Sequence, residues 1–272
     1  MELLWKAALQ GIVQGITEFL PVSSTAHLLL IGDLLNVGHA GFVKLFNIVI
    51  QFASILAAAI YFRKILIPAE LFRDRDVRHR TLDLWRKMIL GVIPILIIGA
   101  VAAKLGWVES MHRRPLILTA ALFVGGVLLL RIEHWCRHEN PVSDFAALSC
   151  RTALLIGVFQ CLAIVPGTSR SAVTIIAALA FGAARPLAAE YSFLLAIPTM
   201  TAASAYSLLK YHGTLSGSEW AALGIGFAVT FLVSLSVVSW LMNFIKTHTF
   251  QLFGWYRIGL AILIAGCLLL NR

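Results

Sequence analysis

Long apolar stretches follow one another along almost the whole of this chain and constrain its fold more than any other feature. A helix needs about 20 mostly apolar residues to cross a bilayer. Hydrophobic residues make up 60% of the 272 residues and charged residues 13%, so a water-soluble fold would expose large apolar patches, which soluble proteins avoid. We therefore predict a single integral-membrane domain over residues 1–272. Its eight apolar stretches are Ala7–Ile31, Leu45–Phe62, Met88–Ala103, Pro115–Leu130, Thr152–Ala184, Tyr191–Leu209, Trp220–Ile245 and Ile258–Leu270.

The first and the fifth stretch are each interrupted by a proline and a polar cluster. Pro21 opens the run PVSSTAH, which ends at His27, and Pro166 opens the run PGTSRS, which ends at Ser171. Proline ends or kinks a helix, and the freed backbone groups must be buried in protein or line a wet cavity. We expect two re-entrant helical hairpins beside about six full transmembrane helices. The predicted fold class is an all-α polytopic membrane protein.

The two broken stretches also resemble each other at a nearly constant offset of 145 to 146 residues. Such a match in register indicates an internal duplication, with repeats over about residues 1–135 and 146–272. The paired features are Gly11 to Gln14 with Gly157 to Gln160, Pro21 with Pro166, Tyr61 with Tyr206, and Lys64 with Lys210.

Basic side chains concentrate in a few connecting loops. Residues 63–87 hold eight of them, and the positive-inside rule makes that loop cytoplasmic. If the hairpins do not cross, loops 131–151, 185–190 and 246–257 lie on the same side, which gives fourteen basic residues inside and seven outside. Three crossings then separate the repeats, so the second is inverted and the hairpins enter from opposite faces. This architecture is best known in transporters.

The net charge of +9 has the same explanation. The inside count includes Arg137 and Arg257, and the outside count includes Arg113 and Arg272. Basic residues in short loops orient a protein in an anionic bilayer. We therefore expect membrane lipids, and no nucleic acid, as partners of the charged loops.

The first hairpin carries two polar pairs at helical spacing. Gln14 and Glu18 are four residues apart and share a helix face, where they could hold a hard divalent cation or hydrogen-bond two helices together. Ser24 and His27 are three residues apart and could form a nucleophile and its base. In the alternative, Ser23 or Ser24 only caps a helix and His27 is a packed polar residue.

The second hairpin predicts an anion-binding turn. Gly167 allows a tight turn, Thr168 or Ser169 can cap the next helix, and Ser171 adds a hydroxyl group. Free N–H groups at a helix start attract anions, and the guanidinium of Arg170 is a planar fork suited to phosphate. In the alternative, Arg170 satisfies loose carbonyl groups at a helix break.

Taken together, the hairpins offer the groups that hydrolysis of a phosphate ester or anhydride requires. One supplies a carboxylate, a hydroxyl and an imidazole, and the other supplies charge stabilisation, which is the largest contribution to such catalysis. The apolar walls imply a lipid substrate. A lipid-phosphate transporter or flippase is the rival prediction, because inverted repeats with broken helices fit it equally well.

A family resemblance begins in the first hairpin. The run from Gln14 to His27, QGITEFLPVSSTAH, resembles the Glu/Gln-x-x-x-Glu box of the bacterial undecaprenyl-diphosphate phosphatases, also called bacitracin-resistance proteins, and its Pro-Val-Ser-Ser-Thr-Gly-His continuation. PGTSRS at 166–171 resembles the second box of that family, and AAEYSFLLAIP at 188–198 is similar to the stretch that follows it. The segment layout matches along essentially the whole chain.

The resemblance implies a metal-dependent membrane phosphatase that converts undecaprenyl diphosphate to undecaprenyl phosphate and inorganic phosphate. This activity recycles the lipid carrier for cell-wall synthesis and confers resistance to bacitracin, which sequesters the diphosphate lipid. The resemblance also implies an enzyme of the bacterial plasma membrane with its cavity open to the outer side. The functional positions of that family map onto Glu18, Ser23, Ser24, His27, Ser169 and Arg170.

These assignments give a mechanistic hypothesis. Arg170 and the amides after Gly167, with Thr168, Ser169, Ser171 and Ser23, bind the diphosphate. Glu18, with Gln14, holds Mg²⁺ or Ca²⁺. Ser24 attacks the terminal phosphorus and His27 removes its proton, or His27 is itself the nucleophile or activates water.

Overall fold

The transmembrane helices predicted from the apolar stretches are present. The structure, a computed structural model, describes residues 1–35, 38–112, 114–136 and 138–270. Within these ranges six helices are long and apolar enough to cross a membrane, as predicted, and the only strand-like pairing is an isolated bridge between Val142 and Ala183. The six are α3 (Ala40–Tyr61), α5 (Arg75–Lys104), α7 (Pro115–Trp135), α10 (Arg185–Leu209), α11 (Gly217–Phe244) and α12 (Gln251–Leu270).

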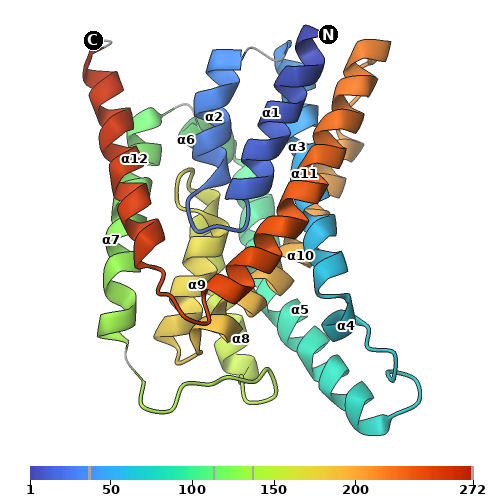
Figure 1. Ribbon diagram of the computed structural model, residues 1–272, viewed down its shortest axis with the longest axis vertical. Coiled ribbons are helices and arrows are strands. Elements are labelled where there is room, and N and C mark those ends of the chain that lie inside the picture. The colour runs from blue at the N-terminus through green and yellow to red at the C-terminus, as the bar shows by residue number, and fades with distance from the viewer. Residues whose placement is uncertain (36–37, 113, 137, 271–272) are drawn as a thin grey trace.

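The two broken stretches form helical hairpins, as expected. The first consists of α1 (Glu2–Thr17) and α2 (Ser24–Leu35), and the second of α8 (Cys150–Gln160), the 3-10 turn η1 (Cys161–Ile164) and α9 (Arg170–Ala180). Figure 1 shows the first hairpin in one half of the molecule and the second in the other half, with their turns near the middle. The helices that leave these turns, α2 and α9, therefore both begin in the interior.

Each hairpin packs against a long helix from the other half of the chain. Helix α1 lies along α11, and α8 lies along α5. Glycine permits both approaches: a Cβ atom at Gly11 would lie 2.9 Å from the carbonyl oxygen of Gly226, and one at Gly157 would lie 2.2 Å from that of Gly91. The halves are thus interlocked, which fixes the positions of the two turns relative to each other.

Several helices begin earlier than the sequence prediction, and the difference is largest at α5. Helix α5 begins at Arg75 rather than near Met88, because the Asp74 carboxylate accepts hydrogen bonds from the amides of Asp76 and Val77 and caps the helix. Many of the basic residues assigned to the 63–87 loop therefore lie on a helix that extends beyond the apolar segment. Two short helices, α4 (Arg63–Leu66) and α6 (Trp107–His112), complete the described elements.

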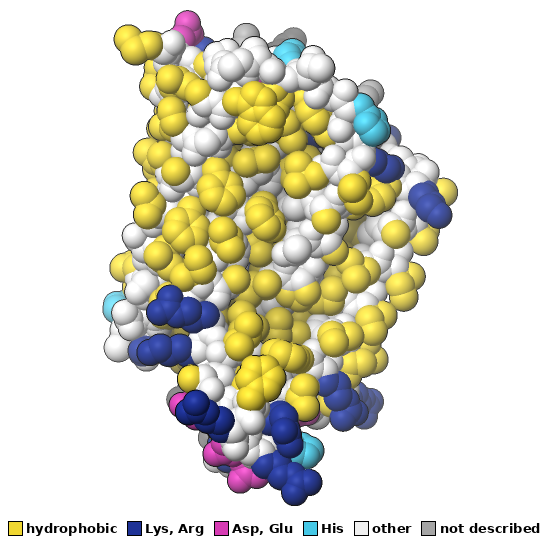
Figure 2. Space-filling model, turned by 90° about the vertical axis from the view of Figure 1, so that its right-hand side faces the viewer, with side chains coloured by type: hydrophobic (Ala, Val, Ile, Leu, Met, Phe, Trp, Pro, Cys, Tyr) yellow, Lys and Arg dark blue, Asp and Glu magenta, His cyan; other side chains and the backbone are white. Residues whose placement is uncertain are grey.

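The loops assigned to one side of the membrane gather at one end of the molecule. In Figure 1 the connections α4–α5, α7–α8 and α11–α12 all lie toward the lower end, while the termini and α6 lie at the upper end. Figure 2 shows Lys and Arg side chains at that lower end beneath a broad hydrophobic band. Arg113, Arg137 and Arg272, which contribute to the predicted charge count, lie outside the described residues.

One counted charge was assigned wrongly. Arg257 was placed in an inside loop, but it lies on α12 and is completely buried. Its guanidinium donates to backbone carbonyl groups in the interior, so it contributes nothing to the charge of the membrane surface.

Candidate active site

The two hairpin turns share an unusual backbone geometry. Ser23, before α2, has φ 72°, and Ser169, before α9, has φ 68°; they are the only non-glycine residues with positive φ in the part of the chain that the structure describes. Such left-handed backbone costs about 1–2 kcal/mol in a non-glycine residue and clusters at functional sites. The two serines are 146 residues apart, which is the offset of the predicted repeat.

The carboxylate of Glu18 joins the two hairpins. Its Oε2 accepts hydrogen bonds from Gln14 Nε2 and Ser24 Oγ, each at 2.8 Å, and its Oε1 accepts one from Arg170 Nη2 at 3.2 Å. The Glu18 and Arg170 side chains are only 4% and 11% exposed. The structure thus brings the carboxylate and hydroxyl groups of the first hairpin together with the guanidinium group of the second hairpin.

Two further contacts join the turns. Ser171 Oγ donates to the carbonyl oxygen of Leu20 at 3.1 Å. Arg257 donates from Nη1 to the carbonyl of Pro21 at 3.1 Å and from Nη2 to that of Gly167 at 2.9 Å. Besides the contact between Glu18 and Arg170, the turns are therefore held together by the side chain of Ser171 from the second hairpin and by that of Arg257 from α12.

Sequence reasoning missed the role of Arg257. Its guanidinium also donates to the carbonyls of Ala121 and Leu122 on α7, and glycine at position 125 makes room for it, since a Cβ there would lie 2.3 Å from Nη2. No carboxylate pairs with Arg257 among the described residues. The sequence contained a signal for this role. Arg257 directly precedes an apolar run, and burying an arginine there is costly unless its hydrogen-bond donors are satisfied within the protein.

The hypothesis that Ser24 and His27 form a hydrogen-bonded pair is not supported by their contacts. Ser24 Oγ donates to Glu18, while His27 bonds through Nδ1 to the carbonyl of Ser23 at 2.8 Å and through Nε2 to the hydroxyl of Tyr256 at 2.6 Å. Ser24 is the first residue of α2, so its side chain turns back toward α1 instead of along the helix face.

The second turn has the features of an anion site. Ser169 caps α9 by accepting a hydrogen bond from the amide of Ala172, as predicted for Thr168 or Ser169, and Thr168 instead donates to the carbonyl of Val165. Gly167 has φ 89°, which glycine adopts readily. Within the described ranges, the backbone N–H groups of Ser169, Arg170 and Ser171 donate to no protein acceptor.

The same holds at the first turn, where the backbone N–H groups of Ser23, Ser24 and Thr25 donate to no acceptor among the described residues. The starts of α2 and α9 thus both present free N–H groups to the interior. Because each start carries a partial positive charge, the region between them favours an anion.

Arg170 is anchored on one side and free on another. Nη1 donates to the carbonyl of Ser192 on α10 at 3.1 Å, and Nη2 contacts Met200 Sδ as well as Glu18. Its Nε is buried and finds no hydrogen-bond partner among the described residues. One donor of the fork therefore remains for a ligand that enters between the turns.

The residues proposed for a divalent cation fit that role by their donor chemistry. Gln14 is fully buried, and its Oε1 has no hydrogen-bond partner in the described part of the chain, so an oxygen ligand is available next to the Glu18 carboxylate. Within the same ranges no cluster of three His, Cys, Asp or Glu residues could hold a metal. Phosphate and water would have to supply the remaining ligands that Mg²⁺ or Ca²⁺ requires.

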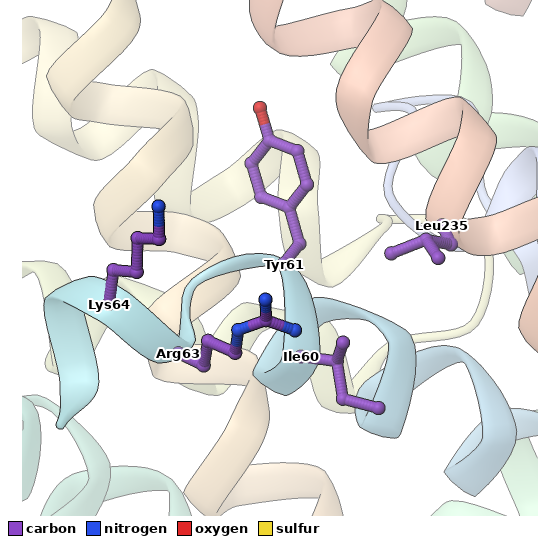
Figure 3. A pocket seen from close by; sticks show the side chains of 5 residues that line it. All are labelled: Ile60, Tyr61, Arg63, Lys64 and Leu235. Carbon is purple, nitrogen blue, oxygen red and sulfur yellow. The ribbon is translucent and has the colours of Figure 1, made fainter.

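A surface pocket lies apart from this site. It is lined by residues of α3, α4 and α11, with the Arg63 and Lys64 side chains and the Tyr61 ring around it (Figure 3). The remaining lining residues are Ile60 and Leu235. The pocket contains none of the residues that the two hairpins bring together, so the site between the turns remains the candidate active site.

Fold and site together define a class of protein. This is a polytopic α-helical membrane protein in which two broken hairpins bring a carboxylate, a serine hydroxyl and a guanidinium into one buried cluster. The chain belongs to the family described as bacitracin resistance protein BacA, whose profile matches residues 7–263.

Curated relatives match over nearly their full length. The chain is 42% identical to undecaprenyl-diphosphatase 1 of Clostridioides difficile, covering 96% of this chain and 94% of the relative. It is also 42% identical to the undecaprenyl-diphosphatase of Aquifex aeolicus, over 96% and 97%. Identity to that of Enterococcus faecalis is 41%, over 95% of each chain.

Proposed function

We propose that this protein hydrolyses undecaprenyl diphosphate to undecaprenyl phosphate and inorganic phosphate. The observation that carries the proposal is the contact between Glu18 and Arg170, which unites the two family boxes in one buried site, in a chain 42% identical to named undecaprenyl-diphosphatases. Hydrolysis returns the lipid carrier for cell-wall polymers. It also removes the diphosphate lipid that bacitracin sequesters, so the enzyme confers bacitracin resistance.

Diphosphate binding begins with an exchange of partners at Arg170. In the structure the Glu18 carboxylate lies beside the Arg170 guanidinium, where an anion would bind. A diphosphate, with more charge and more oxygen atoms, takes over Arg170 and accepts hydrogen bonds from the free amides at the starts of α2 and α9. Ser169, Ser171 and Ser23 lie at these same turns. Binding thereby releases Glu18 from Arg170.

Ser24 is the nucleophile in this mechanism. Its hydroxyl already points at Glu18 Oε2, 2.8 Å away, so Glu18 takes the proton as the Oγ–phosphorus bond forms. The bond from the terminal phosphorus to the bridging oxygen breaks, and undecaprenyl phosphate leaves with the electron pair. The amides and Arg170 stabilise the charge that spreads over the phosphoryl oxygens.

His27 acts in the second half of the reaction. It activates water that attacks the phosphoserine, and the electron pair of the breaking Oγ–phosphorus bond returns to Ser24, which regains its proton from Glu18. This assignment follows the hydrogen bonds, since His27 does not contact the hydroxyl of Ser24 in the structure.

A divalent cation, Mg²⁺ or Ca²⁺, would be held by Glu18 and Gln14. When bound, it supplies Lewis-acid neutralisation of phosphate oxygens. The unpartnered Gln14 Oε1 supports this assignment.

The protein lies in the bacterial plasma membrane with its basic end in the cytoplasm, in accordance with the positive-inside rule. The first hairpin then enters from the outer face, and the site opens to that side. The polyprenyl chain of the substrate lies against the apolar surface of the molecule.

Phosphate release by the purified protein in detergent tests this proposal. Undecaprenyl diphosphate should yield inorganic phosphate with no membrane gradient, a chelator should stop release, and added Mg²⁺ or Ca²⁺ should restore it. Ser24→Ala should lose activity, whereas Ser236→Ala, which removes an exposed hydroxyl on α11, should not. A lipid-phosphate transporter without hydrolytic activity would release no phosphate, and that result would refute the proposal.

A further inference from the structure

We propose that Tyr256, near the start of α12, is a catalytic residue that orients the imidazole of His27 and relays a proton to its Nε2 atom. The inference rests on the proposed function, because it gives His27 a defined way to activate water. Neither the predicted motifs nor the two hairpins include this residue, which comes from the far end of the chain.

The hydrogen bonds of His27 determine where its proton lies. Nδ1 is 2.8 Å from the carbonyl oxygen of Ser23, and a carbonyl can only accept, so Nδ1 carries hydrogen. In the neutral ring Nε2 is then the lone-pair nitrogen. Nε2 is 2.6 Å from the Tyr256 hydroxyl, which therefore donates to it.

The imidazole is held in orientation as well as in protonation state. The rings of His27 and Tyr256 are stacked, with centroids 5.6 Å apart and an interplanar angle of 9°. Tyr256 is in turn held by its neighbour, since buried Arg257 bonds to the turns of both hairpins. The ring pair is thus fixed relative to the site.

Packing alone does not explain this tyrosine. Tyr256 is 49% exposed, so its phenol is not required to fill the core. The hydroxyl oxygen keeps a lone pair that can accept a second hydrogen bond from the attacking water, while its hydrogen is directed at His27.

A proton reaches His27 through this hydroxyl, because Nδ1 is committed to Ser23 and Tyr256 covers Nε2. As the activated water forms its bond to phosphorus, its O–H bond breaks and the proton moves to the Tyr256 oxygen. The original phenol proton moves to Nε2. Tyr256 ends as the neutral phenol it was, and His27 becomes imidazolium until it returns the proton to product or solvent.

The test compares Tyr256→Phe with a matched control, Tyr206→Phe. Tyr206 is also 49% exposed and lies on α10 beside Lys210, away from His27. Loss of a positioned proton-transfer group should lower kcat for phosphate release about 100-fold or more, with KM nearly unchanged because the phenol does not bind the diphosphate. The control should keep wild-type kcat and KM.

A spectroscopic readout separates this proposal from the proposed function. Nitrogen-15 NMR of histidine-labelled protein, with the His27 signals assigned by their loss in His27→Gln, should show the Nδ1–H tautomer in both proteins, because the Ser23 carbonyl holds that hydrogen. The Nε2 signal should shift in Tyr256→Phe, because Nε2 loses its hydrogen bond. If wild type releases no phosphate, the proposed function fails and the NMR comparison still decides the role of Tyr256. An unchanged Nε2 chemical shift in Tyr256→Phe, or an unchanged kcat in an active enzyme, would overturn the proposal.

A second variant covers the case in which Tyr256→Phe does not fold. Fluorotyrosine at position 256 keeps the ring and the hydroxyl but makes the phenol a stronger acid. It should preserve the Nδ1–H tautomer and change kcat measurably while leaving KM as it was. Wild-type kcat together with an unchanged Nε2 chemical shift would contradict the role assigned to Tyr256.

Discussion

Glu18 and Arg170 are 152 residues apart in the chain, yet Glu18 Oε1 lies 3.2 Å from Arg170 Nη2 in the interior of the molecule. The contact exists because two hairpins from opposite halves meet at their turns. It joins the two halves of the site and is also the contact that a diphosphate must replace. Stability and activity should therefore respond differently to changes at these two residues.

Glu18→Gln should lower the free energy of unfolding by about 1.5–3 kcal/mol, the range for a hydrogen bond to a charged group. The substitution leaves the Arg170 charge without its anionic partner. Detergent-solubilised protein unfolded by denaturant would show the loss. The control, Glu2→Gln, breaks an exposed pair with Lys6 and should change little; an equal loss in both variants would contradict a buried ion pair.

Arg170→Lys should reduce kcat/KM at least about 100-fold although the charge is kept, because an ammonium group cannot replace a planar fork. The lysine cannot reach both the Ser192 carbonyl and a phosphate. Arg185→Lys serves as the control, since Arg185 pairs with Glu133 away from the turns and should retain activity. Near-normal turnover in Arg170→Lys would show that a point charge is sufficient.

Gly167→Ala should destabilise the protein by more than the about 1–2 kcal/mol that left-handed backbone costs a non-glycine residue. The added Cβ would also lie 2.4 Å from the carbonyl oxygen of Leu118. Gly99→Ala, at a position on α5 where a Cβ meets nothing within 4 Å, should be neutral or slightly stabilising. Thermal unfolding of the two variants side by side tests the difference.

Gly125→Ala should reproduce the effect of losing Arg257. The new methyl would occupy the space of the guanidinium, and displacement would leave the carbonyls of Pro21 and Gly167 without their donor. Arg257→Met should lower stability and activity together, since the turns lose a shared anchor. Gly224→Ala, at an open position, is the control. Full activity in Gly125→Ala would exclude a role for this anchor.

Ser24→Cys, in a protein whose four native cysteines are replaced, should react in intact cells with a membrane-impermeant maleimide. The expected reaction follows from a site that opens to the outer face, and Ser24 is only half-buried. Labelling is read by mass shift before and after membrane disruption. Modification only after disruption would place the opening on the inner side.

Local sequence patterns were sufficient to predict the elements of the fold. The lengths of the apolar runs predict the six spans, and Pro21 and Pro166 mark the two hairpins. Spacing also predicted that Gln14 and Glu18 share a helix face, and their hydrogen bond is present. These features depend on residues close together in the chain, where helical periodicity is a reliable guide.

Contacts between distant segments could not be predicted in the same way. Arg257 directly precedes the apolar run that begins at Ile258, where an interfacial position is the simpler expectation, so its burial depends on the two turns that surround it. The left-handed backbone at Ser23 and Ser169 has no local signal, because glycine is the usual residue there. Ser24 and His27 illustrate a further limit: shared spacing did not reveal that Glu18 and Tyr256 were closer partners.

The most direct test of a single site built from both hairpins is a double-mutant cycle on kcat/KM with Glu18→Gln and Arg170→Lys. Residues that act as a unit are strongly non-additive. We predict that each single variant loses most of the activity. The kcat/KM of the double variant should be only slightly lower than that of the less active single variant. Losses that simply multiply would mean that the two residues act independently, which contradicts a shared active site between the turns.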